Sequence, residues 1–159
     1  MMKPASIHEI KDTLQALPPA KVSELCLRLA RFKKENKELL TYLLFEADNL
    51  NSYLAELKAE MADSFSEINS SHVYYAKKTL RKILRETSKQ ARYIGDKGAE
   101  AELLITYCRL MKDMGLPLKK YAVLENIFQS QLKKIGKLIN SLHEDLQFEL
   151  RRELKLLEG

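Results

Sequence analysis

The sequence predicts an all-α fold of about eight antiparallel helices, arranged in one bundle or in a short stack of helix pairs. Three observations support this prediction. Apolar residues recur every three or four positions along most of the chain, as they do on one face of a helix. Residues that start or stop helices stand between these stretches. β-branched residues are scattered, and no useful length of the 159-residue chain alternates apolar and polar residues as a strand does.

The start of the chain contains a helix cap and a proline pair. Ser6 and Glu9 form a capping box, in which each side chain can accept a hydrogen bond from the other residue's backbone amide. Pro18 disfavours helical backbone at Leu17, and Pro19 suits the first position of the next helix. We therefore expect a short first helix that ends before the prolines.

Later breaks follow from glycine and from a second capping pattern. Gly95 followed by Asp96 is typical of a helix stop and a new cap, and Gly115 marks another stop. Ser141 and Glu144 repeat the capping-box pattern, which favours a kink or a new helix at that point. The breaks and the apolar spacing together predict helices near 7–16, 20–33, 37–48, 50–66, 72–94, 98–114, 118–140 and 142–157.

The length favours a single domain over residues 1–159, with a kink or a separate C-terminal helix after residue 141. Two stretches, 30–42 and 91–107, each run from an Ala-Arg-aromatic helix end through a short turn to a Glu-Leu-Leu helix start. Over residues 20–114 this repetition resembles the stacked helix pairs of HEAT and armadillo proteins. The resemblance implies an architecture and assigns no functional residue.

Residues with catalytic or metal-binding chemistry are few, and none has the spacing of a known motif. The three histidines and two cysteines are far apart in the sequence: His8, His72, His143, Cys26 and Cys108. The histidines fall at expected helix starts, and the cysteines have the apolar neighbours typical of small core residues. Five scattered glycines provide no phosphate-binding loop. The sequence therefore predicts no metal site, no cofactor, no small-molecule substrate and no enzymatic activity.

Composition also bears on location. No apolar run approaches the roughly 18 residues of a membrane span, and the first residues lack the apolar core of a signal peptide. Two cysteines are too few for a disulfide framework. We therefore expect a cytoplasmic protein without a membrane role.

Charge is unevenly distributed, although the net charge is only +5. Residues 35–67 carry two basic and eight acidic side chains, whereas residues 71–95 carry seven basic and one acidic. The seven basic side chains, which we call the basic stripe, are Lys78, Arg81, Arg85, Lys89 and Arg92, spaced three or four apart on a helix, and the flanking Lys77 and Lys82. Apolar residues suited to the core occupy a different face: Val73, Leu80, Leu84, Ala91 and Ile94. Like charges at this spacing repel by a few tenths of a kcal/mol per pair, so stability alone does not explain the stripe.

Three interpretations of the basic stripe are open. It can be a solvated face whose charge is offset by the acidic region 35–67, packed alongside it or across a dimer. It can bind an acidic protein partner. It can also contact the phosphates of a nucleic acid, although no glycine or aromatic residue is interleaved with the basic residues to support base stacking. A membrane-surface role is disfavoured, because the apolar face of this helix lacks Trp or Phe anchors.

The sequence thus predicts a non-catalytic helical binding or scaffolding module. Its basic helix, residues 77–92, is expected to meet an acidic protein surface, and self-association is one form of that contact. The alternative is binding to a nucleic-acid backbone through the same helix.

Overall fold

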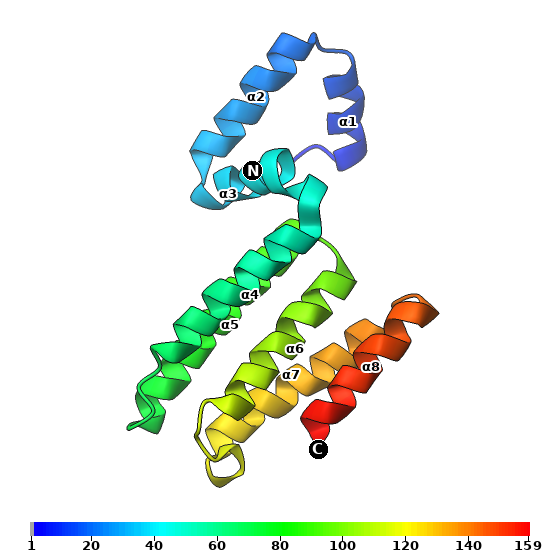
Figure 1. Cartoon of the computed structure of the whole chain (residues 1–159). Coiled ribbons are helices and arrows are strands. Elements are labelled where there is room, and N and C mark those ends of the chain that lie inside the picture. Colours follow the sequence, from blue (N-terminus) through cyan, green and yellow to red (C-terminus); the bar gives the residue numbers. More distant parts are fainter. Residues whose placement is uncertain (1) are drawn as a thin grey trace. The chain divides into compact units, whose positions relative to one another are not determined.

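A computed structural model describes residues 2–159 and confirms the all-α fold. The described residues form eight α-helices and no strand (Figure 1). The chain divides into two compact units, which we call unit 1 (Met1–Phe45) and unit 2 (Glu46–Gly159). Each unit is described by itself below, and the single domain over residues 1–159 stays a prediction.

Unit 1 contains three α-helices: α1 (Ile7–Gln15), α2 (Pro19–Phe32) and α3 (Lys34–Thr41). The capping box is confirmed, because the Ser6 amide donates to Glu9 Oε2 at 2.7 Å and the Glu9 amide donates to Ser6 Oγ at 3.2 Å. Pro19 is the first residue of α2, as expected. None of the residues in these three helices is fully buried.

The expected helix over 37–48 differs from the observed one. Extended backbone at Lys33 is all that separates α2 from α3, and the Asn36 side chain closes this junction by donating from Nδ2 to the Leu29 carbonyl at 2.8 Å. After α3 the chain continues as a π-helix, η1 (Tyr42–Glu46), and a 3-10 helix, η2 (Ala47–Asn49). The winding of the chain therefore changes twice there, and the non-helical backbone of Asn49 precedes the next α-helix.

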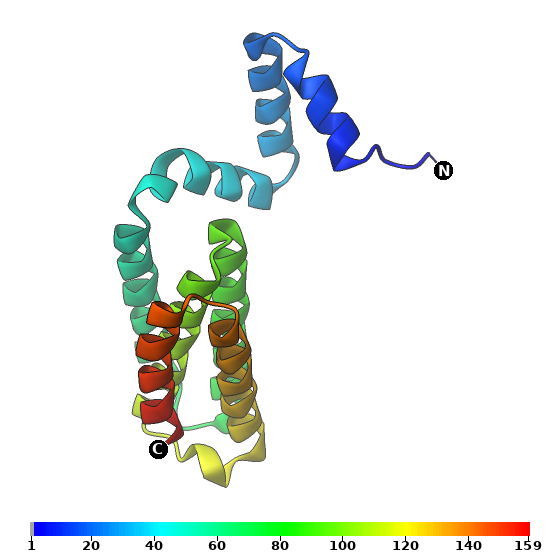
Figure 2. The same ribbon diagram turned by 90° about the vertical axis from the view of Figure 1, so that its right-hand side faces the viewer.

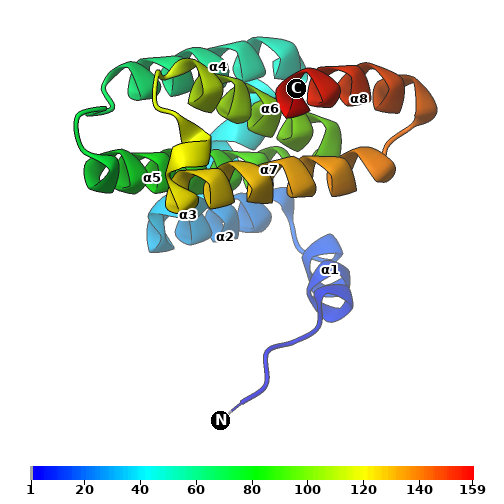
Figure 3. The same ribbon diagram turned by 90° about the horizontal axis from the view of Figure 1, so that it is seen from below.

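Unit 2 holds the hydrophobic core and most of the secondary structure. Its elements after η2 are α4 (Leu50–Ser66), α5 (Val73–Ile94), α6 (Lys97–Asp113), the 3-10 helix η3 (Leu118–Lys120), α7 (Ala122–Asn140) and α8 (Glu144–Glu158). Successive α-helices of this unit run in alternating directions (Figures 1 and 2). The central helix is α6, which contacts α4, α5, α7 and α8 and lies between α4 and α7 in Figure 3. Because α6 is enclosed in this way, it contributes more fully buried residues than any other helix of the unit.

The glycine stops act as predicted. Gly95 ends α5 with a positive φ of 69°, and the next residue, Asp96, caps α6 by accepting from the Ala99 amide at 2.8 Å. Gly115 follows α6 with a φ of 85°. Both glycines therefore occupy the left-handed conformation that other residues adopt at a cost.

The prediction of a second capping box at Ser141 and Glu144 is wrong, although a separate C-terminal helix does follow α7. Ser141 is the C-cap residue that directly follows α7, and its Oγ donates to the Leu138 carbonyl at 2.7 Å. The residue at the start of α8 is instead His143, which makes no side-chain capping bond. Ser141 is thus already used by the helix before the break and does not cap the helix after it.

Candidate functional site

The basic stripe lies on α5, a helix of 22 residues. One face of this helix is buried in the core of unit 2. The buried residues on that face are Ala76, Leu80, Ile83, Thr87 and Ala91, and the expected Val73, Leu84 and Ile94 pack against the core as partly buried residues. Because this apolar face is fixed by packing, the polar face of α5 must turn to solvent.

The structure places the predicted binding residues together on that polar face. Lys78, Arg81, Lys82, Arg85 and Arg92 are exposed, whereas Lys77 and Lys89 are half-buried. Lys89 Nζ lies 3.1 Å from Glu86 Oε2. Within the described residues of unit 2, no carboxylate lies within 4.0 Å of the charged groups of Arg81, Lys82 or Arg85. Within the described part of unit 2, the middle of the stripe is therefore a line of cations without ion-pair partners.

An exposed aromatic group adjoins the stripe at the start of α5. Tyr74 and Tyr75 are 56% and 52% exposed, and their rings meet edge-on with centroids 5.5 Å apart. The ring of His72 packs edge-on against Tyr75 at 5.7 Å. The Nζ atoms of Lys77 and Lys78 lie 5.2 and 5.0 Å from the centroid of the Tyr74 ring, within the range of cation–π attraction. Sequence reasoning missed this group, although the His-Val-Tyr-Tyr run shortly before the first two lysines signalled it.

The neighbouring helix α4 carries an acidic stripe of its own. The stripe consists of Glu56, Glu60 and Asp63 of α4 and of Glu67, the C-cap residue that follows it. These residues are spaced four, three and four apart, and all are exposed. Among the described residues of unit 2, none of these four carboxylates forms an ion pair with the basic stripe. The ion pair that α4 does make joins Lys58 to Glu102 of α6 at 3.2 Å. Offset of the basic charge by direct pairing with α4 is therefore not seen within this unit, and offset across a dimer stays a prediction.

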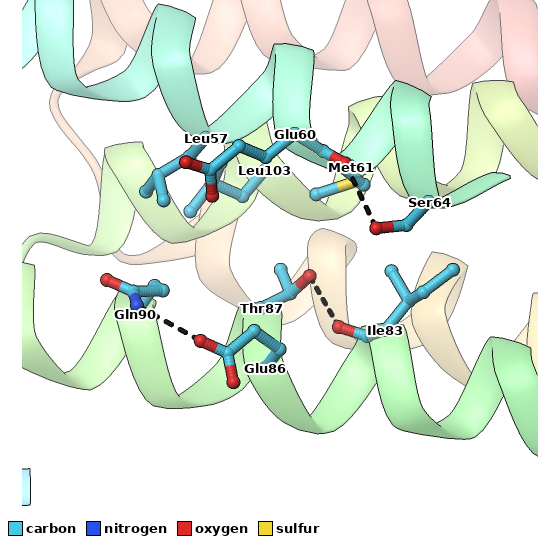
Figure 4. A pocket seen from close by; sticks show the side chains of 9 residues that line it. All are labelled: Leu57, Glu60, Met61, Ser64, Ile83, Glu86, Thr87, Gln90 and Leu103. Atoms are coloured by element: carbon cyan, nitrogen blue, oxygen red, sulfur yellow. Dashed lines mark hydrogen bonds between the residues drawn. The ribbon is translucent and has the colours of Figure 1, made fainter. Parts of the chain in front are cut away.

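A cleft with an apolar floor separates α4 from α5 (Figure 4). Its cavity measures about 90 Å³, and its lining residues are Leu57, Glu60, Met61 and Ser64 of α4, Ile83, Glu86, Thr87 and Gln90 of α5, and Leu103 of α6. Glu60 and Glu86 are exposed at its edges, one on each helix, while Met61, Ile83 and Leu103 are buried in it. No sequence pattern indicates the cleft, because it arises from how two separate helices pack on α6.

The histidines and cysteines stay apart from these features. Among the described residues, no group of three or more His, Cys, Asp or Glu side chains is arranged to hold a metal ion. Cys108 is buried as expected, and burial raises the pKa of its thiol to about 12. Cys26 is only half-buried, so its placement in the core was wrong. At neutral pH the Cys108 thiol is protonated, which makes it a poor nucleophile.

No family model, curated protein or solved structure matches this chain. None of the described helices combines the length and the apolar composition that a membrane span needs. The candidate function therefore depends on the geometry and charge of the residues themselves.

Proposed function

We propose that the chain is a non-catalytic binding module whose basic stripe on α5 binds an acidic protein surface. The observation that carries the proposal is the set Arg81, Lys82 and Arg85, which is exposed and has no ion-pair partner among the described residues of unit 2, on a helix whose other face is fixed in the core. Like charges at helical spacing repel one another. An acidic partner would therefore reduce an electrostatic repulsion that is present in the isolated protein. We place this binding in the cytoplasm, the location that the composition favours.

The dimensions and chemistry of the stripe suit a protein surface. From Lys78 to Arg92 it extends about 21 Å along α5, because a helix rises 1.5 Å per residue. Its arginines can form bidentate hydrogen bonds with carboxylates, which gives direction as well as charge. The adjoining Tyr74 and Tyr75 add exposed aromatic area, and Tyr and Arg are the residue types enriched at the energetic centres of protein interfaces.

Binding to a single-stranded nucleic acid is the second candidate, and one observation favours it. The exposed rings of Tyr74 and Tyr75 lie beside the cations of Lys77 and Lys78. Base stacking on aromatic rings next to a basic track is how proteins bind single strands without reading sequence. The sequence argued against nucleic-acid binding because no aromatic residues are interleaved with the basic ones. Tyr74 and Tyr75, at the start of α5, partly offset that argument.

One titration separates the two candidates. The full chain would be titrated against three labelled probes, namely polyglutamate, single-stranded oligouridine and duplex DNA, at about 50 mM salt and upward. We expect polyglutamate to bind most tightly and to dissociate as salt is added. Tighter binding to oligouridine would favour nucleic-acid binding over binding to an acidic protein. For duplex DNA, a slope of about −4.5 in a plot of log Kobs against log salt concentration would indicate five phosphate contacts. Failure to bind any of the three probes would overturn both candidates.

A further inference from the structure

We propose that the cleft between α4 and α5 is a second docking site, which accepts a basic amphipathic helix of a partner protein. This site uses the acidic stripe of α4 and the apolar floor of the cleft, and the described residues that line the cleft include no member of the basic stripe. The inference therefore stands or falls independently of the proposed function.

The floor of the cleft is apolar in its chemistry as well as in its residues. Its two hydroxyl groups are satisfied by their own helices, since Thr87 Oγ1 donates to the Ile83 carbonyl at 2.8 Å and Ser64 Oγ donates to the Glu60 carbonyl at 3.0 Å (Figure 4). A polar ligand would therefore find neither hydroxyl proton of these two residues free. The cavity left for a ligand is therefore an apolar space that the buried side chains of Met61 and Ile83 help to line.

The size of that space sets what can enter it. The cavity of about 90 Å³ is smaller than the ~150 Å³ cavity that accepts a benzene molecule in an engineered protein. One aliphatic side chain is therefore the ligand group that fits. Beside the cleft, α4 and α5 are linked by a hydrogen bond that the Tyr53 hydroxyl donates to Gln90 Oε1 at 2.5 Å.

The edges of the cleft determine the charge of the partner. Glu60 on α4 and Glu86 on α5 flank the cavity, and none of the described residues that line it is a lysine or an arginine. Glu86 is already paired with Lys89 at 3.1 Å, whereas Glu60 has no cation within 4.0 Å among the described residues. Asp63 extends the negative edge along α4 in one direction and Glu56 in the other. Charge complementarity thus calls for a partner with cations on either side of its aliphatic residue.

The spacing of the acidic stripe favours a helix over an extended peptide. From Glu56 to Glu67 the four carboxylates cover about 16 Å in steps of roughly one helical turn. Lysines or arginines three and four positions apart on a partner helix have the same repeat. With an aliphatic residue between them, such a helix would bind as an amphipathic helix does in a groove.

The test uses the full chain and a labelled helix-forming peptide with leucines on one face and lysines at each edge of that face. Two control peptides accompany it: a scrambled version of the same composition and a version with glutamine in place of lysine, which removes the cations without adding carboxylates that the basic stripe would bind. Fluorescence anisotropy at low salt would report the dissociation constants. We expect the amphipathic basic peptide to bind at least about tenfold more tightly than either control, a difference of ~1.4 kcal/mol.

Matched variants locate the site. Glu60→Lys/Asp63→Lys reverses the charge of the α4 edge of the cleft. Ser64→Phe fills the cavity without changing the charge. Both are expected to weaken binding about tenfold or more. Asp113→Lys/Glu149→Lys makes the same charge change at exposed positions of α6 and α8 and is expected to leave it unchanged. Thermal unfolding would verify that each variant is folded.

Three results would overturn the proposal. They are equal binding of the scrambled and amphipathic basic peptides, unchanged binding by the Ser64→Phe variant, and no binding of the basic peptide by the wild type.

Discussion

The Tyr107 hydroxyl on α6 donates a hydrogen bond of 2.9 Å to the backbone carbonyl of Leu80 on α5. Both residues are fully buried. The Tyr107 ring also meets the ring of Phe65 on α4 edge-on, with centroids 5.4 Å apart. One side chain therefore links three helices and reinforces the packing that holds the Leu80 face of α5 against the core. The outward direction of the basic stripe follows from that packing as a whole.

Removal of that hydroxyl should cost stability without changing the fold. For Tyr107→Phe we predict a free energy of unfolding lower by about 1 kcal/mol, the usual contribution of one buried hydrogen bond. Urea denaturation followed by circular dichroism would measure it. The control is Tyr75→Phe, which removes an exposed hydroxyl and should change stability by less than about 0.5 kcal/mol. Equal effects of the two substitutions would contradict the role assigned to Tyr107.

Stability should fall at alkaline pH. Burial raises the pKa of Cys108 from 9.0 to about 12 and also raises the pKa of Tyr107 above its ordinary 10.0. Above about pH 9 the unfolded chain loses the thiol proton while the folded chain keeps it, so ionisation favours unfolding. The protonated Cys108 thiol contributes its full share to the free energy of unfolding below about pH 9. This contribution is lost as the pH rises towards 12, by up to about 1.4 kcal/mol per pH unit for one group.

Urea titrations at a series of pH values would measure this dependence. The variant Cys108→Ala lacks the buried thiol, so between about pH 9 and 10 its stability should depend less steeply on pH than that of the wild type. Parallel pH profiles for the two proteins would show that the thiol is ionised equally in the folded and unfolded chains.

Two glycine substitutions should have opposite effects. Gly95 has a φ of 69°, so Gly95→Ala should destabilise the chain by about 1 kcal/mol although no atom crowds the new methyl group. Gly136 lies inside α7, and no atom beyond its own helical backbone lies within 4 Å of the place that an added methyl group would take. Gly136→Ala should therefore stabilise the chain by about 0.5–1 kcal/mol. Thermal melting compares both variants with the wild type, and a shift of the same sign for both would count against these expectations.

Local signals in the sequence predicted the parts of the fold that depend on local chemistry. The Ser6 cap, the Pro19 helix start and the Gly95 stop all appear where expected, because each depends on the backbone preferences of one or two residues. Helical spacing also separated the basic stripe of α5 from the buried face around Leu80, whereas the exposure of the stripe was left open by the sequence.

The features that were missed depend on longer-range packing. Ser141 was expected to cap α8, but its hydroxyl bonds back to Leu138 in α7, an alternative with the same local pattern. The cleft between α4 and α5 depends on how both helices rest on α6, which no residue spacing reveals. The acidic stripe was seen only as a net charge over residues 35–67, because a sum over a segment does not separate the faces of one helix.

The central claim is that cations at specific positions on α5, rather than the net charge of the chain, bind an acidic surface. The most direct measurement compares the dissociation constants for polyglutamate of the wild type, Arg81→Glu/Arg85→Glu and Lys133→Glu/Lys137→Glu. The last variant makes the same charge change at exposed positions four residues apart on α7. We predict that the α5 variant binds at least about tenfold more weakly than the wild type, whereas the α7 variant stays within about twofold. Equal weakening of both variants would contradict the account, because net charge alone would then explain the binding.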